Sequence, residues 1–398
     1  MLERIKRLGI NTVSNVASVV LPPIRVVDSR YKIFTTIRDE NAHIFRGYYD
    51  IDFFSYDRSY FLYHMLLKDS ETKNQISIGV YDLKNQEKRI VGHSNCWCWQ
   101  QGCRLRWIDK DKILLNDCIE DQYCSKIIDV NTNTVEKVYS MAFYDIHIGK
   151  KYGLGVNFSR LQRLRPGYGY RTLEDRTKGI DHPKDDGVYY YDMDSDKCNL
   201  LFSIYDVHEL IGDKTKGEGY INHISISPNG NSFIFFYIED MEKYHQKVYL
   251  MRYEFSNNSI YLIENRRRLS HYAWIDNEHL LTTNYLCGKQ YYGIYHLNSG
   301  EYDDYGENIL RYDGHPTVTG KDQIISDTYP LSRRFKRQCL FSYSENTNKI
   351  NTIATFSTNP KYEGESRCDL HPSINDDMIS VDTNCFGLRS IVILKKEI

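Results

Sequence analysis

Four histidines recur at matching places in the second half of the sequence, and their side chains can do chemistry. They are His223, His271, His315 and His371, separated by 48, 44 and 56 residues. Each begins a run that reads as an alternating strand, a polar turn and a second strand, as in NHISISPNGNSFIFF and LHPSINDDMISV. Neutral imidazoles bind divalent metals and also act as general bases near neutral pH. The pattern therefore indicates a metal site, a proton-transfer site, or both.

The repeat that carries these histidines predicts a β-propeller. A third strand follows each pair, such as KVYLMRYE from Lys247, and usually a fourth, such as NSIYLIE from Asn258. Four short strands in roughly every 40–55 residues are typical of a propeller blade. The same layout without the histidine begins at Tyr48, Arg104 and Ala142. We therefore expect an all-β chain with seven blades.

The expected propeller needs one strand from the beginning of the chain. Its last blade has three strands before the sequence ends, so we expect YKIFTTI from Tyr31 to supply the fourth. Such closure removes free sheet edges and makes residues 30–398 one domain. Residues 1–29 are predicted to form a short N-terminal extension that is mostly helical. This helix would pack on the propeller or, alternatively, make a peripheral contact with a membrane surface.

Composition narrows the class of protein further. The chain has 51 Lys and Arg against 53 Asp and Glu, a net charge of −2, so nothing favours a nucleic-acid partner. Ten cysteines are scattered without a CxxC pair, which favours reduced thiols and a cytoplasmic location. No segment resembles a signal peptide or a spanning helix. The 34 tyrosines fit a strand-rich protein and a surface that binds sugars.

Matching positions on successive blades form a ring around the central channel, because the first strand of each blade lines it. The histidines occupy this position on four consecutive blades, and Arg104 occupies it on the second blade. Asp369 lies two residues before His371 and points the same way along an alternating strand. Imidazoles converging with a carboxylate predict a divalent metal site. Separately, one of the histidines is a candidate general base or acid.

A segment rich in arginine and tyrosine interrupts the third blade. The run NFSRLQRLRPGYGYRTLEDR contains Arg160, Arg163, Arg165, Tyr168 and Tyr170 around a Pro-Gly turn. Guanidinium groups bind carboxylates through two hydrogen bonds, and tyrosine rings stack on sugar faces. The run therefore indicates a site for an acidic sugar, with a solvated charged loop as the alternative.

A second candidate for sugar binding precedes the second blade. CWCWQQGCRLRW places Trp99 and Gln100 close to Arg104 at a blade entrance. These residues are expected either to form a platform for sugar stacking or to pack in the core. Common catalytic motifs are absent, including G-x-S-x-G, H-E-x-x-H and the phosphate-binding loops.

The histidine-bearing segments resemble those of the oligogalacturonate lyase family. The resemblance rests on INHISI, LSHYAWIDNEHL, DGHPTVTGKDQIISDTYP and CDLHPSINDDMISVDTNCFG, and is clearest from about residue 220 onward. The family is a seven-bladed propeller that cleaves uronate oligosaccharides by β-elimination with a bound divalent metal, typically manganese. The resemblance thus implies a lyase, a metal cofactor, and an acidic oligosaccharide or polysaccharide as substrate.

The resemblance also assigns roles to individual residues. His271 and His371 correspond to metal-binding histidines of the family, and His223 corresponds to its catalytic histidine. His315 aligns with another family histidine, which implies either a fourth ligand or a substrate contact.

Two positions depart from the family pattern. Asp369 stands where the family has a further histidine, and it remains a competent metal ligand. Ser366 stands where the family has a glutamine ligand, for which it is a poor substitute. The departures leave the metal open: Mn²⁺ is expected first, with Zn²⁺ or Ca²⁺ as alternatives.

β-Elimination accounts for this set of residues on chemical grounds as well. Neutralising the uronate carboxylate, by the metal together with Arg163 or Arg165, makes the C5 proton easier to remove. His223 would take that proton, and Tyr168 or Tyr170 would protonate the leaving oxygen. The alternatives are a non-catalytic propeller that binds glycan or protein around a structural metal, and a metal-assisted glycan hydrolase.

Overall fold

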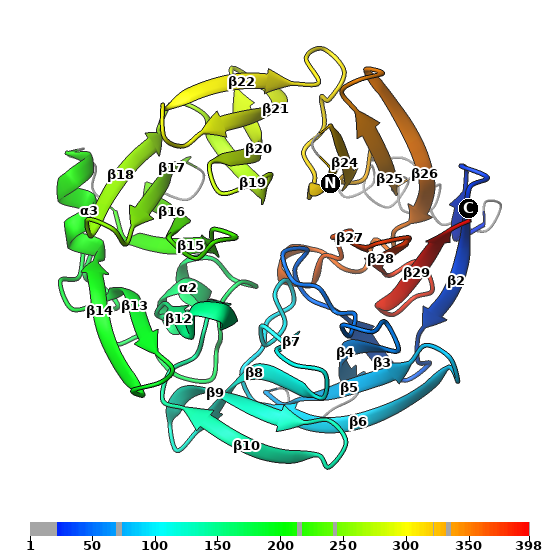
Figure 1. Cartoon of the computed structure of the whole chain (residues 1–398), viewed down its shortest axis with the longest axis horizontal. Coiled ribbons are helices and arrows are strands. Elements are labelled where there is room, and N and C mark those ends of the chain that lie inside the picture. Colours follow the sequence, from blue (N-terminus) through cyan, green and yellow to red (C-terminus); the bar gives the residue numbers. More distant parts are fainter. Residues whose placement is uncertain are drawn as a thin grey trace, which may run out of the picture.

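The computed structural model describes residues 22–68, 74–212, 217–241, 245–320, 322–331 and 336–397. Within these ranges seven antiparallel sheets are arranged in a ring around a central axis (Figure 1). The predicted all-β, seven-bladed propeller is therefore confirmed. The described helices are short: η1 (Ile148–Lys150), α2 (Phe158–Leu164), α3 (Ile204–Ile211) and η3 (Gly364–Ser366).

The first four blades follow one another along the chain, each as four antiparallel strands. Blade one consists of β3 (Ala42–Phe45), β4 (Tyr60–Leu67), β5 (Ile76–Asp82) and β6 (Glu87–Ser94). Blade two consists of β7 (Arg106–Trp107), β8 (Lys112–Ile119), β9 (Gln122–Asp129) and β10 (Thr134–Tyr139). Blade three consists of β11 (Asp145–His147), β12 (Tyr152–Gly155), β13 (Gly187–Asp192) and β14 (Lys197–Ser203). Blade four consists of β15 (Gly219–Ile226), β16 (Ser232–Met241), β17 (His245–Glu254) and β18 (Ser259–Glu264).

The last three blades include two strands from the start of the chain. Blade five consists of β19 (Arg268–Trp274), β20 (His279–Leu286), β21 (Lys289–His296) and β22 (Glu301–Tyr305). Blade six consists of β23 (Thr317–Gly320), β24 (Gln323–Asp327), β25 (Arg337–Ser344), β26 (Lys349–Ser357) and β1 (Ile24–Val26). Blade seven consists of β27 (Ser373–Asn375), β28 (Met378–Thr383), β29 (Ser390–Lys396) and β2 (Tyr31–Ile37).

Strand β2 closes the ring as the sequence predicted. It pairs antiparallel with β29, from Tyr31 opposite Lys396 to Ile37 opposite Ile391. Tyr31 and Ile37 are buried against the core, whereas Ile33 is 43% exposed. The first and last parts of the propeller therefore share one sheet, which removes the free edge of blade seven.

Strand β1 is a feature that the sequence analysis did not foresee. It adds a fifth strand to blade six, with Ile24 opposite Phe356 and Val26 opposite Ala354. The helix expected in the N-terminal extension, and its suggested membrane contact, fall in residues 1–21, outside the described residues. Among the described residues, no helix has the length and apolar character needed to cross a bilayer.

Buried tyrosines connect different blades near the axis. The Tyr144 hydroxyl donates to Asn222 Oδ1 at 2.9 Å, and the Tyr49 hydroxyl donates to the backbone oxygen of Tyr272 at 2.8 Å. Buried tyrosines usually have such a partner for the hydroxyl. Much of the high tyrosine content therefore serves the architecture.

Blade three contains a long connection between its second and third strands. Residues 156–186 join β12 to β13 and contain α2, whose N-cap Asn157 accepts a hydrogen bond from Arg160 N at 3.0 Å. This insertion is the arginine- and tyrosine-rich segment singled out in the sequence.

We expect closure by β2 to control stability. Ile37→Ala should lower the free energy of unfolding by about 2–4 kcal/mol, because Ile37 is 1% exposed and its removal leaves a cavity. Ile33→Ala, on the same strand but exposed, should cost less than about 1 kcal/mol. Chemical denaturation of both variants measures this difference. Equal losses would contradict the observed burial of β2.

Candidate active site

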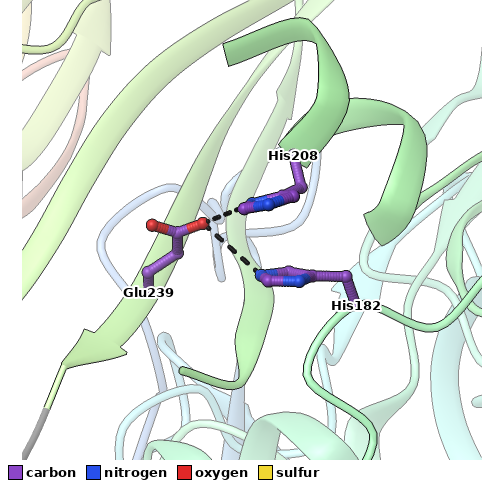
Figure 2. Close-up of side chains that lie close together, drawn as sticks. All are labelled: His182, His208 and Glu239. Atoms are coloured by element: carbon purple, nitrogen blue, oxygen red, sulfur yellow. Dashed lines mark hydrogen bonds and ion pairs between the residues drawn. The ribbon is translucent and has the colours of Figure 1, made fainter. Parts of the chain in front are cut away.

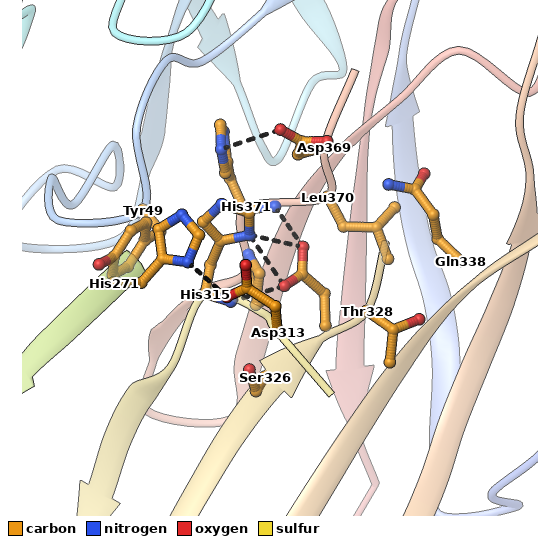
Figure 3. A network of polar contacts seen from close by, with 12 residues as sticks. Tyr49, His271, Asp313, His315, Ser326, Thr328, Gln338, Asp369, Leu370 and His371 are labelled. Atoms are coloured by element: carbon orange, nitrogen blue, oxygen red, sulfur yellow. Dashed lines mark hydrogen bonds and ion pairs between the residues drawn. The ribbon is translucent and has the colours of Figure 1, made fainter. Parts of the chain in front are cut away.

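The four repeated histidines lie together at the centre of the ring of blades. The ring centroids of His271 and His315 are 4.0 Å apart, and those of His315 and His371 are 4.2 Å apart. His223 is next in line, 6.4 Å from His271. All four side chains are buried. Figure 3 shows His271, His315 and His371 facing one another from blades five, six and seven.

Three of these imidazoles have an acceptor for Nδ1. His271 Nδ1 lies 3.1 Å from Asp313 Oδ1, His315 Nδ1 lies 2.9 Å from Asp327 Oδ1, and His371 Nδ1 lies 3.0 Å from the Gly47 carbonyl oxygen. These acceptors place the ring proton on Nδ1. In the neutral ring the lone pair is then on Nε2, as in histidines that bind metals through Nε2.

Asp369 stands beside the free nitrogens of two of these rings. His315, Asp369 and His371 each offer a ligand atom, and these atoms all lie within 4.8 Å of one another. His315 Nε2 and His371 Nε2 are buried without a hydrogen-bond partner among the described residues. Imidazole nitrogen and carboxylate oxygen are ordinary ligands of divalent transition metals. The residues therefore fit a divalent metal ion.

The remaining predicted ligands lie at different distances from this group. His271 is adjacent to His315 but outside the closest set of three. Ser366 lies in η3, and its hydroxyl donates to the Glu363 carbonyl oxygen at 3.1 Å, so it does not replace the missing glutamine. The best-supported ligand set is thus His315, Asp369 and His371, with His271 next to it.

His223 differs from the other three histidines. Its Nδ1 is buried without a partner among the described residues, so no acceptor fixes its tautomer. Burial, followed by the positive charge of His271, lowers the pKa of His223 well below the usual value. Its backbone has φ of 53°, a left-handed conformation that it shares with His371, at 47°. A neutral imidazole with an unpartnered nitrogen beside the other histidines is a candidate proton acceptor.

The charge on His315 follows from the carboxylates around it. Burial lowers its pKa, but Asp327, Asp369 and Asp313 together outweigh this effect and raise it. His371 Nδ1 faces a carbonyl oxygen instead of a carboxylate, and burial lowers the pKa of His371 well below the usual value.

Tyr48 is a site residue that the sequence analysis did not single out. Its ring centroid lies 4.9 Å from that of His371 and 5.5 Å from that of His223, and it is 1% exposed. Its hydroxyl has no partner among the described residues. Gly47, with φ of 139° and a Cβ position only 3.0 Å from the Gln101 carbonyl oxygen, turns the chain here as only glycine can. The signal was the Gly-Tyr-Tyr run directly after the first inner strand.

Two arginines flank Tyr168 beside the histidines. The Arg165 and Arg367 guanidinium carbons lie 5.3 and 5.9 Å from the centre of the Tyr168 ring. Arg367 also donates to the Tyr168 hydroxyl at 2.9 Å and to Asp369 Oδ2 at 2.8 Å. The Tyr168 ring is 5.7 Å from that of His223. Arg367 was missed, although it lies two residues before Asp369 on the same face of an extended segment.

A cavity of about 330 Å³ opens beside this group. Arg367 and Asp369 line it together with Tyr329 and Tyr362. An arginine, a carboxylate and aromatic rings around one cavity suit an acidic sugar.

Two arginines of the insertion have structural tasks instead of the predicted substrate-binding role. Arg160 is 1% exposed and donates to the carbonyl oxygens of Gly219, Thr177, Ile180 and Asp181 at 2.8–3.1 Å. Arg163 forms ion pairs with Asp175 and Glu218. These partners saturate both guanidinium groups and fasten the insertion to the propeller.

Tyr170 and Arg104 are likewise structural. The Tyr170 hydroxyl accepts a hydrogen bond from Asn116 at 2.9 Å, and its ring stacks on Phe158 at 4.3 Å. Arg104 binds both carboxylate oxygens of Asp50 at 2.9 and 3.1 Å and is 1% exposed. Tyr170 therefore lacks access to a substrate, and the charge of Arg104 is neutralised within the protein.

Trp99 and Gln100, the second predicted platform for sugar stacking, both contact other parts of the protein. Gln100 is buried and donates to the carbonyl oxygens of Glu365 and Arg367, so it positions the segment leading to Asp369. Trp99 packs against the Arg389 guanidinium at 4.8 Å and is half-buried. The core-packing alternative accounts for both contacts.

Comparison with known proteins identifies the fold. No protein-family model and no curated protein sequence matches the chain. An oligogalacturonate lyase from Vibrio parahaemolyticus is 12% identical with a TM-score of 0.63, covering 94% of this chain and 96% of its own. An oligogalacturonate lyase in complex with manganese is 12% identical with a TM-score of 0.64, covering 94% and 97%. These structures confirm the expected resemblance at the level of the fold.

The fold alone does not define an activity. The β-propeller domain of the Trilobed protease from Pyrococcus furiosus is also similar, with 11% identity, a TM-score of 0.51, and coverage of 89% of this chain and 95% of its own. The chemistry must therefore be argued from the site itself.

We expect the central histidines to bind one divalent ion, as measured by calorimetric titration of the chelator-treated protein with Mn²⁺. His371→Ala should abolish binding, and Asp327→Asn should weaken it about 10–100-fold, because it removes the negative charge from the group that accepts from His315 Nδ1. Asp303→Asn removes a similar but exposed partner of His296 and should change nothing. Unchanged affinity in both His371→Ala and Asp327→Asn would contradict the assignment.

We expect the two classes of arginine to separate experimentally. Arg160→Leu leaves buried carbonyl oxygens without donors and should cost at least about 3 kcal/mol of stability. The Arg165 guanidinium makes no hydrogen bond or ion pair among the described residues, so Arg165→Leu should change the free energy of unfolding by less than about 1 kcal/mol. Thermal unfolding measures both effects. A larger loss from Arg165→Leu would reverse this interpretation.

Proposed function

We propose that this protein is a lyase that cleaves an oligosaccharide or polysaccharide containing uronic acid by metal-assisted β-elimination. The observation that carries the proposal is the buried group of unpartnered imidazole nitrogens beside Asp369, next to a neutral His223 and two arginines. The fold shared with oligogalacturonate lyases supports it. Mn²⁺ is the proposed metal, and Zn²⁺ or Ca²⁺ are alternatives.

Each residue of the site has a task in such a reaction. A divalent ion bound by His315, Asp369 and His371 would supply positive charge beside the uronate carboxylate and so acidify the C5 proton. Arg165 and Arg367 would orient that carboxylate. His223 would take the proton from C5 as the C4–C5 double bond forms and the C4–O bond breaks.

The leaving oxygen needs a proton, and two tyrosines are available. Tyr48 has an unpartnered hydroxyl, and burial raises its pKa well above the usual value, so it is protonated and able to donate. Tyr168 was the candidate from the sequence, but its hydroxyl already accepts from Arg367. We assign the donor role to Tyr48 and keep Tyr168 as a substrate contact.

Hydrolysis fits the site less well. Glycoside hydrolases generally need two carboxyl groups on either side of the scissile bond. The carboxylates nearest the histidines are engaged: Asp313 with His271, Asp327 with His315, and Asp369 with Arg367. A proton acceptor and cations suit elimination better.

We expect the Mn²⁺-loaded protein to release 4,5-unsaturated uronate from acidic glycans, detected by its ultraviolet absorbance. His223→Ala should lower kcat about 10²–10⁴-fold, because it removes the base. Tyr48→Phe, which removes only the hydroxyl, should also lower kcat while metal binding is kept.

Two outcomes would overturn the proposal. New reducing ends without the unsaturated product would indicate hydrolysis. Glycan binding without any product, unaffected by His223→Ala, would indicate a non-catalytic propeller.

A further inference from the structure

A second group of histidines lies outside the central site, where blade three meets blade four. His182 lies in the insertion after α2, four residues before its end at residue 186, His208 lies on helix α3, and Glu239 lies on strand β16 (Figure 2). The three residues each offer a ligand atom, all within 4.8 Å of one another. The three residues come from the insertion, α3 and β16, so one ion bound by all three would connect these elements.

The geometry of the group suits one ion. His208 Nδ1 lies 2.9 Å and His182 Nε2 3.6 Å from Glu239 Oε1. A tetrahedral Zn²⁺ with ligands at about 2.0–2.2 Å sets neighbouring ligand atoms about 3.3–3.5 Å apart. The two observed separations bracket this value.

The polar groups of the site are satisfied unevenly. Glu239 is fully buried and accepts hydrogen bonds from His208 and, at 2.9 Å, from the Tyr237 hydroxyl. His182 Nε2 is buried without a hydrogen-bond partner among the described residues, although it faces the same carboxylate. The two imidazole rings stack 3.6 Å apart and only 15° from parallel. The unpartnered lone pair of His182 Nε2, 3.6 Å from Glu239 Oε1, is therefore available to bind a cation.

We propose that His182, His208 and Glu239 form a second divalent metal site, with Zn²⁺ as the best-fitting ion. Two imidazoles and one carboxylate are a common zinc ligand set that leaves a fourth position for water. Each ring would turn about its Cβ–Cγ bond to direct its lone pair at the ion. The proton that His208 Nδ1 now donates to Glu239 would be released to solvent on binding.

The site would clamp the insertion to blade four. Directly before His182, the carbonyl oxygens of Ile180 and Asp181 accept from Arg160, and Asp181 also accepts from Gly219 N at the start of β15. The same insertion carries Arg165 and Tyr168 to the central histidines. The proposed ion therefore strengthens the attachment of a segment that forms one wall of the candidate active site, and it stands independently of the proposed reaction.

Zinc titration of the full, chelator-treated protein tests the proposal. We expect two equivalents of Zn²⁺ to bind, one of which is lost in His182→Gln/His208→Gln and the other in His315→Ala/His371→Ala. Zn²⁺ should also raise the midpoint of thermal unfolding of the His315→Ala/His371→Ala variant by about 3 °C or more. An unchanged zinc stoichiometry in His182→Gln/His208→Gln would overturn the proposal.

A matched control and a second measurement keep the test decisive. The ring centroids of His279 and His296 are 4.7 Å apart on blade five, and each ring pairs with an exposed aspartate. The His279→Gln/His296→Gln variant should therefore still bind two equivalents of Zn²⁺. If the His182→Gln/His208→Gln variant does not fold, anomalous scattering at the zinc edge of the unaltered protein decides. An anomalous peak next to Glu239 supports the site, and its absence rejects it.

Discussion

The arrangement of the centre depends on the carboxylate of Asp327. Its Oδ1 accepts from both the backbone N and Nδ1 of His315, at 2.7 and 2.9 Å, and its Oδ2 accepts from His371 N at 3.1 Å. One buried side chain thus joins blade six to blade seven, orients one imidazole and fixes its tautomer. The same device joins blade seven to blade one, where Asp382 accepts from Arg46 N, and blade two to the segment that enters blade three, where Asn116 Oδ1 accepts from Phe143 N.

This device explains how a repeated scaffold holds different chemical groups. The polar side chain on the second strand of one blade, such as Asp327, bonds the backbone where the next blade begins, at His371. The side chain at the start of that next blade can therefore vary while its backbone stays in place. Where the side chain is a histidine with an acceptor on Nδ1, as at His371, the site offers a metal ligand. Where no acceptor is present, as at His223, the site offers a proton acceptor. These local hydrogen bonds therefore decide which histidines of the ring suit metal binding and which suits proton transfer.

Most of the fold and part of the site could be predicted from the sequence. Alternating strands and polar turns are local signals, and they located the closing strand at Tyr31, the four histidines and most of the blades. The exception is blade one, which begins with β3 (Ala42–Phe45) and not at Tyr48. The sequence does not show which arginine side chain is available to a ligand. Arg160 and Arg165 lie on one short segment, but only the fold shows that carbonyl oxygens accept hydrogen bonds from all three nitrogens of the Arg160 guanidinium. The role of Tyr48 depended in the same way on a backbone turn at Gly47.

A crystal of the full chain soaked with Mn²⁺, measured at the manganese edge, tests the central claim most directly. The account predicts an anomalous peak within about 2.0–2.3 Å of His315 Nε2 and His371 Nε2, with an Asp369 oxygen completing the set. The absence of a peak among these three side chains, or a peak only beside Glu239, would contradict a metal-assisted reaction at the centre of the propeller.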